Sequence, residues 1–242
     1  MATEDNIYTR TQKIIGARGL EILNNSRIAV FGLGGVGGYA VEALCRSGIG
    51  VLDIVDNDII NSTNLNRQII ATTENIGMYK TDEFEKRIHL ISPKTIVNKY
   101  KLFYLPNSSE QFDFSSYDYV IDAIDTVSAK IDIIKQCKRN DVPIISCMGC
   151  GNRLNPSLLE ITDIYKTKND PLSRIIRKKL RKENISNLKV VYSSEDPIKK
   201  EYLSKDNNKF NERVPASMIF VPASAGIMLA SEVVKDLIQN IM

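Results

Sequence analysis

The 242-residue sequence predicts an α/β protein with a mostly parallel sheet and helices on both faces of that sheet. Two observations support this fold class. Strand and helix patterns alternate over residues 1–150, and the run IAVFGLGGVGG at 28–38 places a glycine-rich turn directly after an apolar strand. Parallel strands that are covered on both faces are typically continuous apolar runs, as residues 28–31 are. The alternation itself is typical of strand–helix–strand units.

The predicted elements of residues 1–150 follow in order along the chain. Strands are expected at 27–31, 51–56, 95–101, 118–123 and 143–147. Helices are expected at 10–24, 36–47, 80–91 and 127–139. Because right-handed crossovers join parallel strands, the carboxyl ends of these strands meet at one edge of the sheet, where ligands bind. The arrangement is that of a Rossmann-like core.

Residues 151–242 are predicted to form an extension packed on this core. Short strands are expected at 158–162, 188–193 and 217–221, separated by a basic helix at 172–183 and a polar loop at 194–215. A closing helix is predicted after Pro222, with Ser224 as its N-cap.

Composition indicates an ordinary globular protein, with 43% hydrophobic and 25% charged residues. No stretch approaches the ~20 apolar residues of a membrane span. The polar N-terminus does not have the pattern of a secretory signal, and four cysteines in a chain of this size favour reduced thiols. We therefore expect a cytoplasmic protein without a membrane partner.

The net charge of +3 is unevenly distributed. Residues 166–213 hold 14 Lys and Arg against 7 Asp and Glu, whereas the rest of the chain holds 18 against 22. A basic segment of this kind favours a nucleic acid as a partner.

Glycines follow the first predicted strand. Gly32, Gly34 and Gly37 fit the spacing GxGxxG, which allows the backbone to approach a phosphate and directs the next helix's N-terminal N–H groups at an anion. A turn that only packs tightly would have the same spacing, so the pattern alone is a weak signal. We expect Gly32, Gly34 and Gly35 to contact a nucleotide.

Polar side chains follow the second predicted strand. Asp56 ends the strand, where an acid hydrogen-bonds the ribose hydroxyls of a nucleotide or only caps the loop. Asp58 either orients this loop or contributes to a metal site. Asn64, Arg67 and Gln68 come next, in a segment too polar for a core, and an arginine can bind a triphosphate through two hydrogen bonds at once.

Two more charged residues are expected at the same edge. Lys80 opens the helix at 80–91, where it either contacts phosphate as a point charge or is an ordinary solvated lysine. Asp125 supplies an oxygen ligand for Mg²⁺, whereas Asp122 in the same run is interpreted as a strand-end cap. Together these residues predict a site for ATP and Mg²⁺. A dehydrogenase that binds a nicotinamide cofactor needs the acidic residue after the second strand, but it does not need the Asn–Arg–Gln run, the lysine and the second aspartate.

The ordered motifs GLGGVG, VDND, NLNRQ, Lys80 and DAID resemble the adenylating superfamily of ubiquitin-activating enzymes and their bacterial relatives in molybdopterin and thiamine biosynthesis. This resemblance implies catalytic roles for Arg67, Lys80 and Asp125. The YTR at 8–10 is similar to the superfamily's N-terminal arginine motif. It implies a homodimer in which Arg10 reaches the ATP of the partner subunit.

Within the superfamily, one branch is similar over nearly the whole chain. The runs RSGIG, VIDAIDT, KTKNDPLSRIIRKKLRK, VVYSSEDP and FVPASAGIMLASEVVKDLI resemble the tRNA threonylcarbamoyladenosine dehydratases. This resemblance implies an ATP-dependent enzyme that acts on tRNA and cyclises threonylcarbamoyladenosine through an acyl-adenylate of the threonyl carboxylate.

The basic helix at 172–183 is the predicted RNA contact. Asp170 and Pro171 provide its start, as N-cap and first helical residue. Its Lys and Arg side chains form a positively charged patch. This patch is either an ordinary solvated helix face or a surface whose charge is neutralised by the phosphates of a nucleic acid. The predicted RNA-binding residues are Arg174, Arg177, Lys178, Arg181 and Lys182.

The cysteines do not predict a zinc site. Cys147 and Cys150 form a single CxxC, whereas a structural zinc site typically needs two such pairs, and Cys45 and Cys137 are isolated on apolar helix faces. In the family that the chain resembles, small residues stand at positions 147 and 150, so a structural role is expected there. His89 is expected at a surface or packing position.

Three other functions remain open from the sequence. The main alternative is an adenylyltransferase that activates the C-terminus of a ubiquitin-like sulfur-carrier protein, although no cysteine follows position 150. A nicotinamide-dependent oxidoreductase and a non-catalytic nucleotide-binding scaffold are the others. A requirement for a monovalent cation, the set of tRNAs, and sulfur-mobilising or other accessory proteins are not fixed by the residues.

Overall fold

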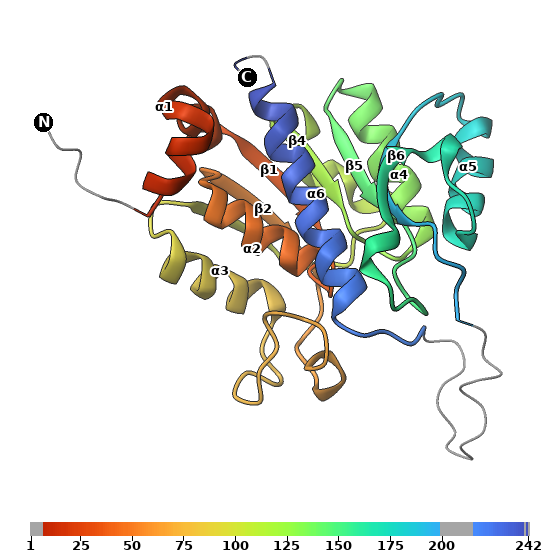
Figure 1. The fold of residues 1–242 in the computed structure, drawn as a ribbon, viewed down its shortest axis with the longest axis horizontal. Coiled ribbons are helices and arrows are strands. Elements are labelled where there is room, and N and C mark those ends of the chain that lie inside the picture. The colour runs from red at the N-terminus through yellow and green to blue at the C-terminus, as the bar shows by residue number, and fades with distance from the viewer. Residues whose placement is uncertain (1–6, 199–214, 240, 242) are drawn as a thin grey trace, which may run out of the picture.

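A computed structural model of the chain describes residues 7–198, 215–239 and 241. One seven-stranded sheet, in the order β3-β2-β1-β4-β5-β7-β6, forms its centre (Figure 1). The strands are β1 (Arg27–Phe31), β2 (Val51–Val55), β3 (Ile96–Tyr100), β4 (Tyr119–Asp122), β5 (Ile144–Cys147), β6 (Leu159–Asp163) and β7 (Lys189–Ser193). The helices are α1 (Thr9–Asn25), α2 (Gly37–Ser47), α3 (Lys80–Ile91), α4 (Val127–Arg139), α5 (Pro171–Lys182) and α6 (Phe220–Ile238). Neighbouring strands are parallel except β6, which is antiparallel to β7, so the predicted fold class is confirmed.

The sheet has a hydrophobic core on each face. On one face Ile28 and Val30 of β1 pack with residues of α1, α2, α3 and α6. On the other face Ala29 and Phe31 of the same strand pack with α4, α5 and the segment that precedes β4. Because successive side chains of a strand point to opposite faces, a strand covered on both sides is apolar at every position. This is why residues 28–31 form an uninterrupted apolar run.

The predicted strand at 217–221 is wrong, and so is the predicted cap at Ser224. Helix α6 begins at Phe220, and Ser224 lies inside it. A short apolar run does not distinguish a strand from a buried helix. Here Val221, Ala225 and Leu229 are buried at helical spacing. Pro222 is tolerated because it lies in the first turn, whose N–H groups have no partner within the helix.

Helix α6 packs directly against α2, the helix that follows the glycine-rich turn (Figure 1). A Cβ atom added to Gly226 of α6 would overlap the carbonyl oxygen of Val36, so only glycine allows this close approach. The C-terminal helix is therefore part of the support of the turn.

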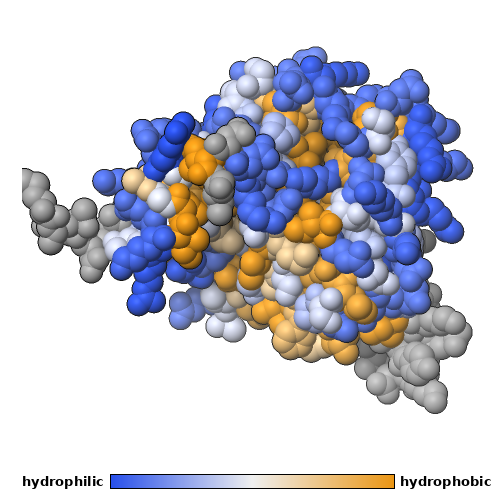
Figure 2. Space-filling view, turned by 45° about the horizontal axis from the view of Figure 1, so that its top comes forward, coloured by the Kyte–Doolittle hydropathy of each residue, from blue (hydrophilic) through white to orange (hydrophobic). Residues whose placement is uncertain are grey.

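The face of the molecule along which α6 lies is partly apolar. Figure 2 shows hydrophobic residues gathered there between hydrophilic ones. Three large hydrophobic residues just before α6 or in its first half are about half exposed, namely Met218, Phe220 and Ile227. The outer side of α6 therefore presents apolar surface to the solvent, while its inner side belongs to the core.

Two further differences from the predicted elements concern the N-terminal helix and the late loop. The helix predicted at 10–24 is interrupted at Gly16, whose φ of 73° is not helical. Most of the loop predicted at 194–215 lies outside the described residues. Within the part of the chain that the structure describes, no helix is long and apolar enough to cross a membrane.

Candidate active site

A cavity of about 330 Å³ lies at the carboxyl edge of the sheet, beyond the ends of β1, β2, β3 and β4. The loops that follow these strands form its wall, which is the position expected for a ligand site in a parallel sheet. The predicted nucleotide-site residues that line the cavity are Gly32, Gly34, Gly35, Asp56, Asp58, Asn64, Arg67, Gln68, Lys80 and Asp125.

The glycine-rich turn forms one side of the cavity. Gly32 has a φ of 89°, and a Cβ atom there would lie 2.8 Å from the carbonyl oxygen of Ala123. At Gly34, by contrast, an added Cβ would meet no atom within 4 Å, so bare backbone faces open space. Gly32 is therefore required by the fold, whereas Gly34 leaves room for a ligand close to the main chain.

The Asp56 carboxylate stabilises this turn through hydrogen bonds. One of its carboxylate oxygens accepts a 2.7 Å hydrogen bond from the Leu33 N–H, and the other accepts a 2.8 Å bond from the Asp58 N–H. Burial raises the pKa of Asp56, although the nearby Lys80 and both N–H groups oppose the shift. The carboxylate thus holds the loops after β1 and β2 together at the cavity wall.

Lys80 is a buried cation and not a solvated surface lysine. Only 3% of the residue is exposed. Its Nζ lies 2.6 Å from the Asp58 carboxylate and 3.7 Å from that of Asp56. The first residue of α3 therefore brings a positive charge to the cavity, with Asp58 as its partner.

The segment between β2 and α3 supplies the remaining polar side chains. The side-chain oxygen of Asn64 accepts a 3.1 Å bond from the Asn61 N–H, which fixes the turn. Arg67 donates to the carbonyl oxygen of Thr63 at 2.8 Å and to the side chain of Asn66 at 2.9 Å, and its stem lies against Gly35.

Gln68 follows directly and is almost completely buried. It is 7% exposed, and its Oε1 has no hydrogen-bond partner among the described residues. An acceptor of this kind is costly to bury without a partner. Gln68 also lines the cavity, so its side chain lies beside the space that a ligand would occupy.

The two aspartates of the DAID run differ in their surroundings. Asp125 is exposed on the cavity wall. Asp122 is fully buried, and its carboxylate forms a 2.8 Å ion pair with Lys130 of α4. Interpreting Asp122 as a cap is incomplete: it does accept a 3.2 Å bond from the Ile124 N–H, but Lys130 is its main partner. The sequence contains no signal for this pair beyond a lysine on an otherwise apolar helix face.

The structure does not bring Arg10 to the cavity. Arg10 is exposed near the start of α1. The nearby Tyr8 donates to Ser92 Oγ at 2.7 Å and to the Cys45 carbonyl oxygen at 3.2 Å. These two groups belong to the C-terminal ends of α3 and α2, so Arg10 lies at the opposite edge of the sheet from the cavity.

The basic helix α5 is held by its buried side. Asp170 caps it by accepting a 2.8 Å bond from the Ser173 N–H, and Ile176 and Leu180 are fully buried. Arg177 turns inward and donates to Thr167 and to the carbonyl oxygen of Ile164. The predicted RNA-binding cations that remain on the surface are Arg174, Lys178, Arg181 and Lys182.

The cysteines occupy two kinds of position. Cys45 and Cys137 are fully buried in the two cores, whereas Cys147 and Cys150 lie together at the end of β5. Among residues 7–198, 215–239 and 241, no cluster of three or more His, Cys, Asp or Glu side chains could hold a metal ion. His89 is exposed on α3, as predicted.

The chain belongs to the ThiF family, whose pattern matches residues 8–241. Its sequence is 42% identical to the tRNA threonylcarbamoyladenosine dehydratase of Bacillus subtilis (strain 168), over 97% of this chain and 95% of that protein. The dehydratase of the same name from Escherichia coli (strain K12) is 38% identical over 72% of this chain and 65% of its own length. The crystal structure of E. coli tRNA N6-threonylcarbamoyladenosine dehydratase, TcdA, in complex with ATP matches with a TM-score of 0.87 and 30% identity, over 96% of this chain and 94% of that one. The family resemblance predicted from the motifs is confirmed.

Proposed function

We propose that the protein is an ATP-dependent dehydratase that cyclises threonylcarbamoyladenosine in tRNA. The observation that carries the proposal is a cavity in which Arg67 and Lys80 lie beside a bare glycine turn, in a chain that aligns almost end to end with a relative of that name. The E. coli dehydratase that was crystallised in complex with ATP has the same fold.

The reaction has two steps. The carboxylate of the threonyl group attacks the α-phosphate of ATP, which forms an acyl-adenylate and releases pyrophosphate. A nucleophile of the same modified base then attacks the acyl carbon, AMP leaves, and the ring closes. The first step redistributes negative charge over phosphate oxygens, so catalysis depends mainly on positioning and on cations.

The cavity residues fit these requirements. We assign the adenosine to Gly34, Gly35 and Asp56, because the turn offers open space and Asp56 lies at the end of β2. We assign the phosphates to Arg67 and Lys80, with Asn64 and Asp58 orienting their loops. When ATP binds, the Lys80 ammonium can share its charge between Asp58 and a phosphate.

The cavity wall offers one carboxylate ligand for Mg²⁺. The exposed carboxylate of Asp125 on the cavity wall is a suitable oxygen ligand, and Mg²⁺ is usually bound by one or two carboxylates together with substrate phosphates and water. A bound Mg²⁺ would neutralise phosphate charge. We therefore infer that Asp125 holds the ion only when the nucleotide is present.

We also infer that two parts of the chain have different functions. Residues 1–150 would bind and activate ATP, while residues 151–242, with the basic segment 166–213, would bind tRNA. The exposed cations of α5 support this assignment, because they lie on a helix that the buried Ile176 and Leu180 anchor to the core.

A homodimer would complete the site. Arg10 lies too far from the cavity of its own chain to contact the nucleotide there, so the arginine would serve the partner subunit's cavity. Hydrophobic residues gather along α6 (Figure 2), and this surface is suited to a contact between subunits. Met218, Phe220 and Ile227, in or just before this helix, are about half exposed. Exposed apolar patches of this kind commonly mark protein–protein interfaces.

The decisive experiment is nucleoside analysis of tRNA that carries threonylcarbamoyladenosine, after incubation with the purified protein and ATP. We expect a product lighter by one water, together with one AMP and one pyrophosphate per ring formed. Arg67→Ala protein and omission of ATP are the controls. Unchanged tRNA, together with pyrophosphate exchange that requires an added sulfur-carrier protein, would support the alternative adenylyltransferase function instead.

A further inference from the structure

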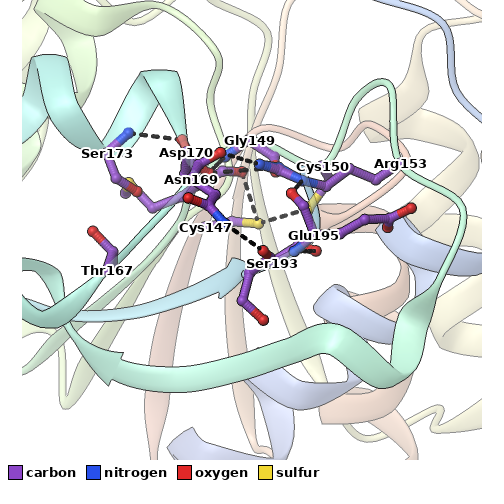
Figure 3. Close-up of polar contacts among 12 residues, drawn as sticks. Cys147, Gly149, Cys150, Arg153, Thr167, Asn169, Asp170, Ser173, Ser193 and Glu195 are labelled. Atoms are coloured by element: carbon purple, nitrogen blue, oxygen red, sulfur yellow. Dashed lines mark hydrogen bonds and ion pairs between the residues drawn. The ribbon is translucent and has the colours of Figure 1, made fainter. Parts of the chain in front are cut away.

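Two thiols lie side by side at the carboxyl end of β5 (Figure 3). Cys147 is the last residue of the strand, Cys150 follows after a two-residue turn, and their Sγ atoms are 3.5 Å apart. Cys147 is 4% exposed, whereas Cys150 is partly exposed. The other two cysteines, Cys45 and Cys137, have no exposed surface.

The turn between the two thiols contacts the start of α5. The Gly149 N–H donates a 3.0 Å hydrogen bond to Asp170, the residue that caps α5. Arg153, which is 4% exposed, donates to the carbonyl oxygens of Gly149 and Asn169, and its guanidinium lies 3.7 Å from Asp170. Figure 3 shows these side chains converging on the turn. The backbone of the CxxC is therefore tied to the N-terminus of the basic helix.

The residues that flank the CxxC are bonded to other segments. Ser146, which precedes Cys147, is the β-partner of Asp122, the residue before the cavity wall formed by Ala123 and Asp125. Asn152 bonds to Ile198 and to Ala216 through its backbone, at 2.7 Å in each case. The turn itself bonds directly to the capping residue of α5, so a change in its conformation would act first on α5.

We propose that Cys147 and Cys150 are a redox modification site, at which a peroxide forms a reversible intramolecular disulfide that alters the position of α5. The Cys150 thiol releases its proton to the solvent, and the thiolate attacks one peroxide oxygen. The O–O bond breaks, so that a sulfenic acid and a hydroxide form, and the hydroxide takes up a proton to give water. The Cys147 sulfur then attacks the sulfenic sulfur, the S–O bond breaks, and the oxygen leaves as water with the Cys147 proton. Two thiols and one hydrogen peroxide thus give one disulfide and two waters, and the sulfurs lose two electrons to the peroxide.

The order of these steps follows from accessibility and charge. Cys150 is the one cysteine of the four that is not buried. The hydrogen bond to Cys150 and burial both raise the pKa of the Cys147 thiol, so Cys147 keeps its proton until the second step. Burial raises the pKa of Cys45 to about 11 and that of Cys137 well above its ordinary value, so neither competes.

The geometry also predicts the consequence for α5. A disulfide bond is about 2.0 Å long, so the two Sγ atoms must approach each other by roughly 1.5 Å. The intervening backbone, which includes the Gly149 N–H, must adjust. Because that N–H bonds the capping residue Asp170, the first turn of α5 is the part that responds. The effect on RNA rests on the proposed function, whereas the disulfide itself does not.

Disulfide formation can be tested on the full-length protein without tRNA. The reduced protein is treated with hydrogen peroxide, denatured and alkylated with N-ethylmaleimide, and its mass is measured. We expect the number of alkylated thiols to fall from four to two, a Cys147–Cys150 linked peptide, and full recovery with dithiothreitol. Cys137→Ala should still lose two thiols, whereas Cys150→Ser should form no such link. Retention of all four thiols, linkage between chains, or loss that dithiothreitol does not reverse would overturn the proposal.

The coupling to α5 needs a separate readout. Hydrogen exchange at the amides of Gly149 and Ser173 should speed up in the oxidised protein, but not in peroxide-treated Cys150→Ser. tRNA affinity should fall several-fold on oxidation and recover on reduction, with ATP affinity unchanged. Identical exchange in both redox states would refute the coupling. Failure of the reduced protein to bind tRNA would count against the proposed function, while the exchange result would still decide whether the disulfide moves α5.

Discussion

Lys130 Nζ lies 2.8 Å from the Asp122 carboxylate, and neither side chain is exposed to solvent. Asp122 ends β4, Lys130 belongs to α4, and the loop between them contains the cavity-wall residues Ala123 and Asp125. The hydroxyl of Ser146 on β5 donates to the same carboxylate. This buried pair therefore positions the loop that we assign to Mg²⁺.

Replacing Lys130 with Met should lower the free energy of unfolding by about 3–5 kcal/mol, because it leaves the buried Asp122 carboxylate without its cation. Lys135→Met is the matched control on the same helix, since Lys135 pairs with Glu183 at the surface. The control should cost at most about 1 kcal/mol. Urea unfolding of both variants measures the difference, and equal losses would show that burial of the pair has no energetic consequence.

Arg67→Ala should slow ATP–pyrophosphate exchange by about 10²-fold or more, because it removes a cation from the charge that develops on the phosphates. The fold should persist, since within the described part of the chain the Arg67 guanidinium bonds to the neighbouring Thr63 and Asn66 alone. Arg46→Ala, at the far end of α2, serves as the control and should keep the exchange rate. Near-normal turnover of the Arg67 variant would mean that the phosphates bind elsewhere.

Mixing Arg10→Ala protein with Asp125→Ala protein should restore activity that neither variant has alone. If Arg10 acts at the partner subunit's cavity, each mixed dimer contains one cavity with both residues intact. Activity is measured after subunit exchange has been demonstrated by differential labelling. Exchange without recovery would place Arg10 outside the composite site.

Replacing Arg174, Lys178, Arg181 and Lys182 with Gln should weaken binding of all tRNAs alike. The slope of log affinity against log salt should flatten by roughly 0.7 to 0.9 for each phosphate that the variant no longer binds. Arg177 is left in place because its guanidinium holds Thr167 and Ile164. Lys13→Gln with Lys94→Gln, two exposed changes elsewhere, tests whether a lower net charge alone has this effect. A solvated helix face predicts an unaltered slope for both proteins.

Glu42 should make stability depend on pH at the acid end. Burial alone would raise the pKa of this carboxyl, but hydrogen bonds from Arg87 and Arg46 outweigh it and lower the pKa. A lowered folded-state pKa stabilises the protein above the unfolded-state pKa, and this contribution is lost as pH falls through the folded value. Glu42→Gln should therefore reduce the free energy of unfolding at neutral pH and have a shrinking effect in acid. Urea unfolding across this pH range measures the effect, and a cost that is independent of pH would indicate a packing effect.

Much of the fold can be predicted because the local patterns are strong. Helices α3 and α4 have the predicted bounds, since each is amphipathic and is flanked by polar residues. The strands of residues 1–150 are predictable because continuous apolar runs alternate with these helices. The insertion of β7 between β5 and β6 does not follow from such patterns, because strand order depends on pairing between distant segments.

The members of the candidate site are predictable, but their states are not. Residue type and order identify Asp56, Arg67 and Lys80, and all three line the cavity. The sequence does not distinguish Lys80 from a surface lysine, because its burial beside Asp58 depends on the packing of two separate segments. It does not predict the ion pair of Asp122 and Lys130 either, because a single buried pair of charged residues leaves no periodic pattern in the sequence.

The close contact of α6 with α2 has a consequence for how the protein is made. Helix α2 follows the glycine turn, yet part of its covering surface is provided by residues 220–238, which leave the ribosome long after it does. During synthesis, the apolar face of α2 therefore stays exposed until α6 has been made and packs against it. The glycine turn therefore gains its full support for nucleotide binding only after residues 220–238 have packed against α2.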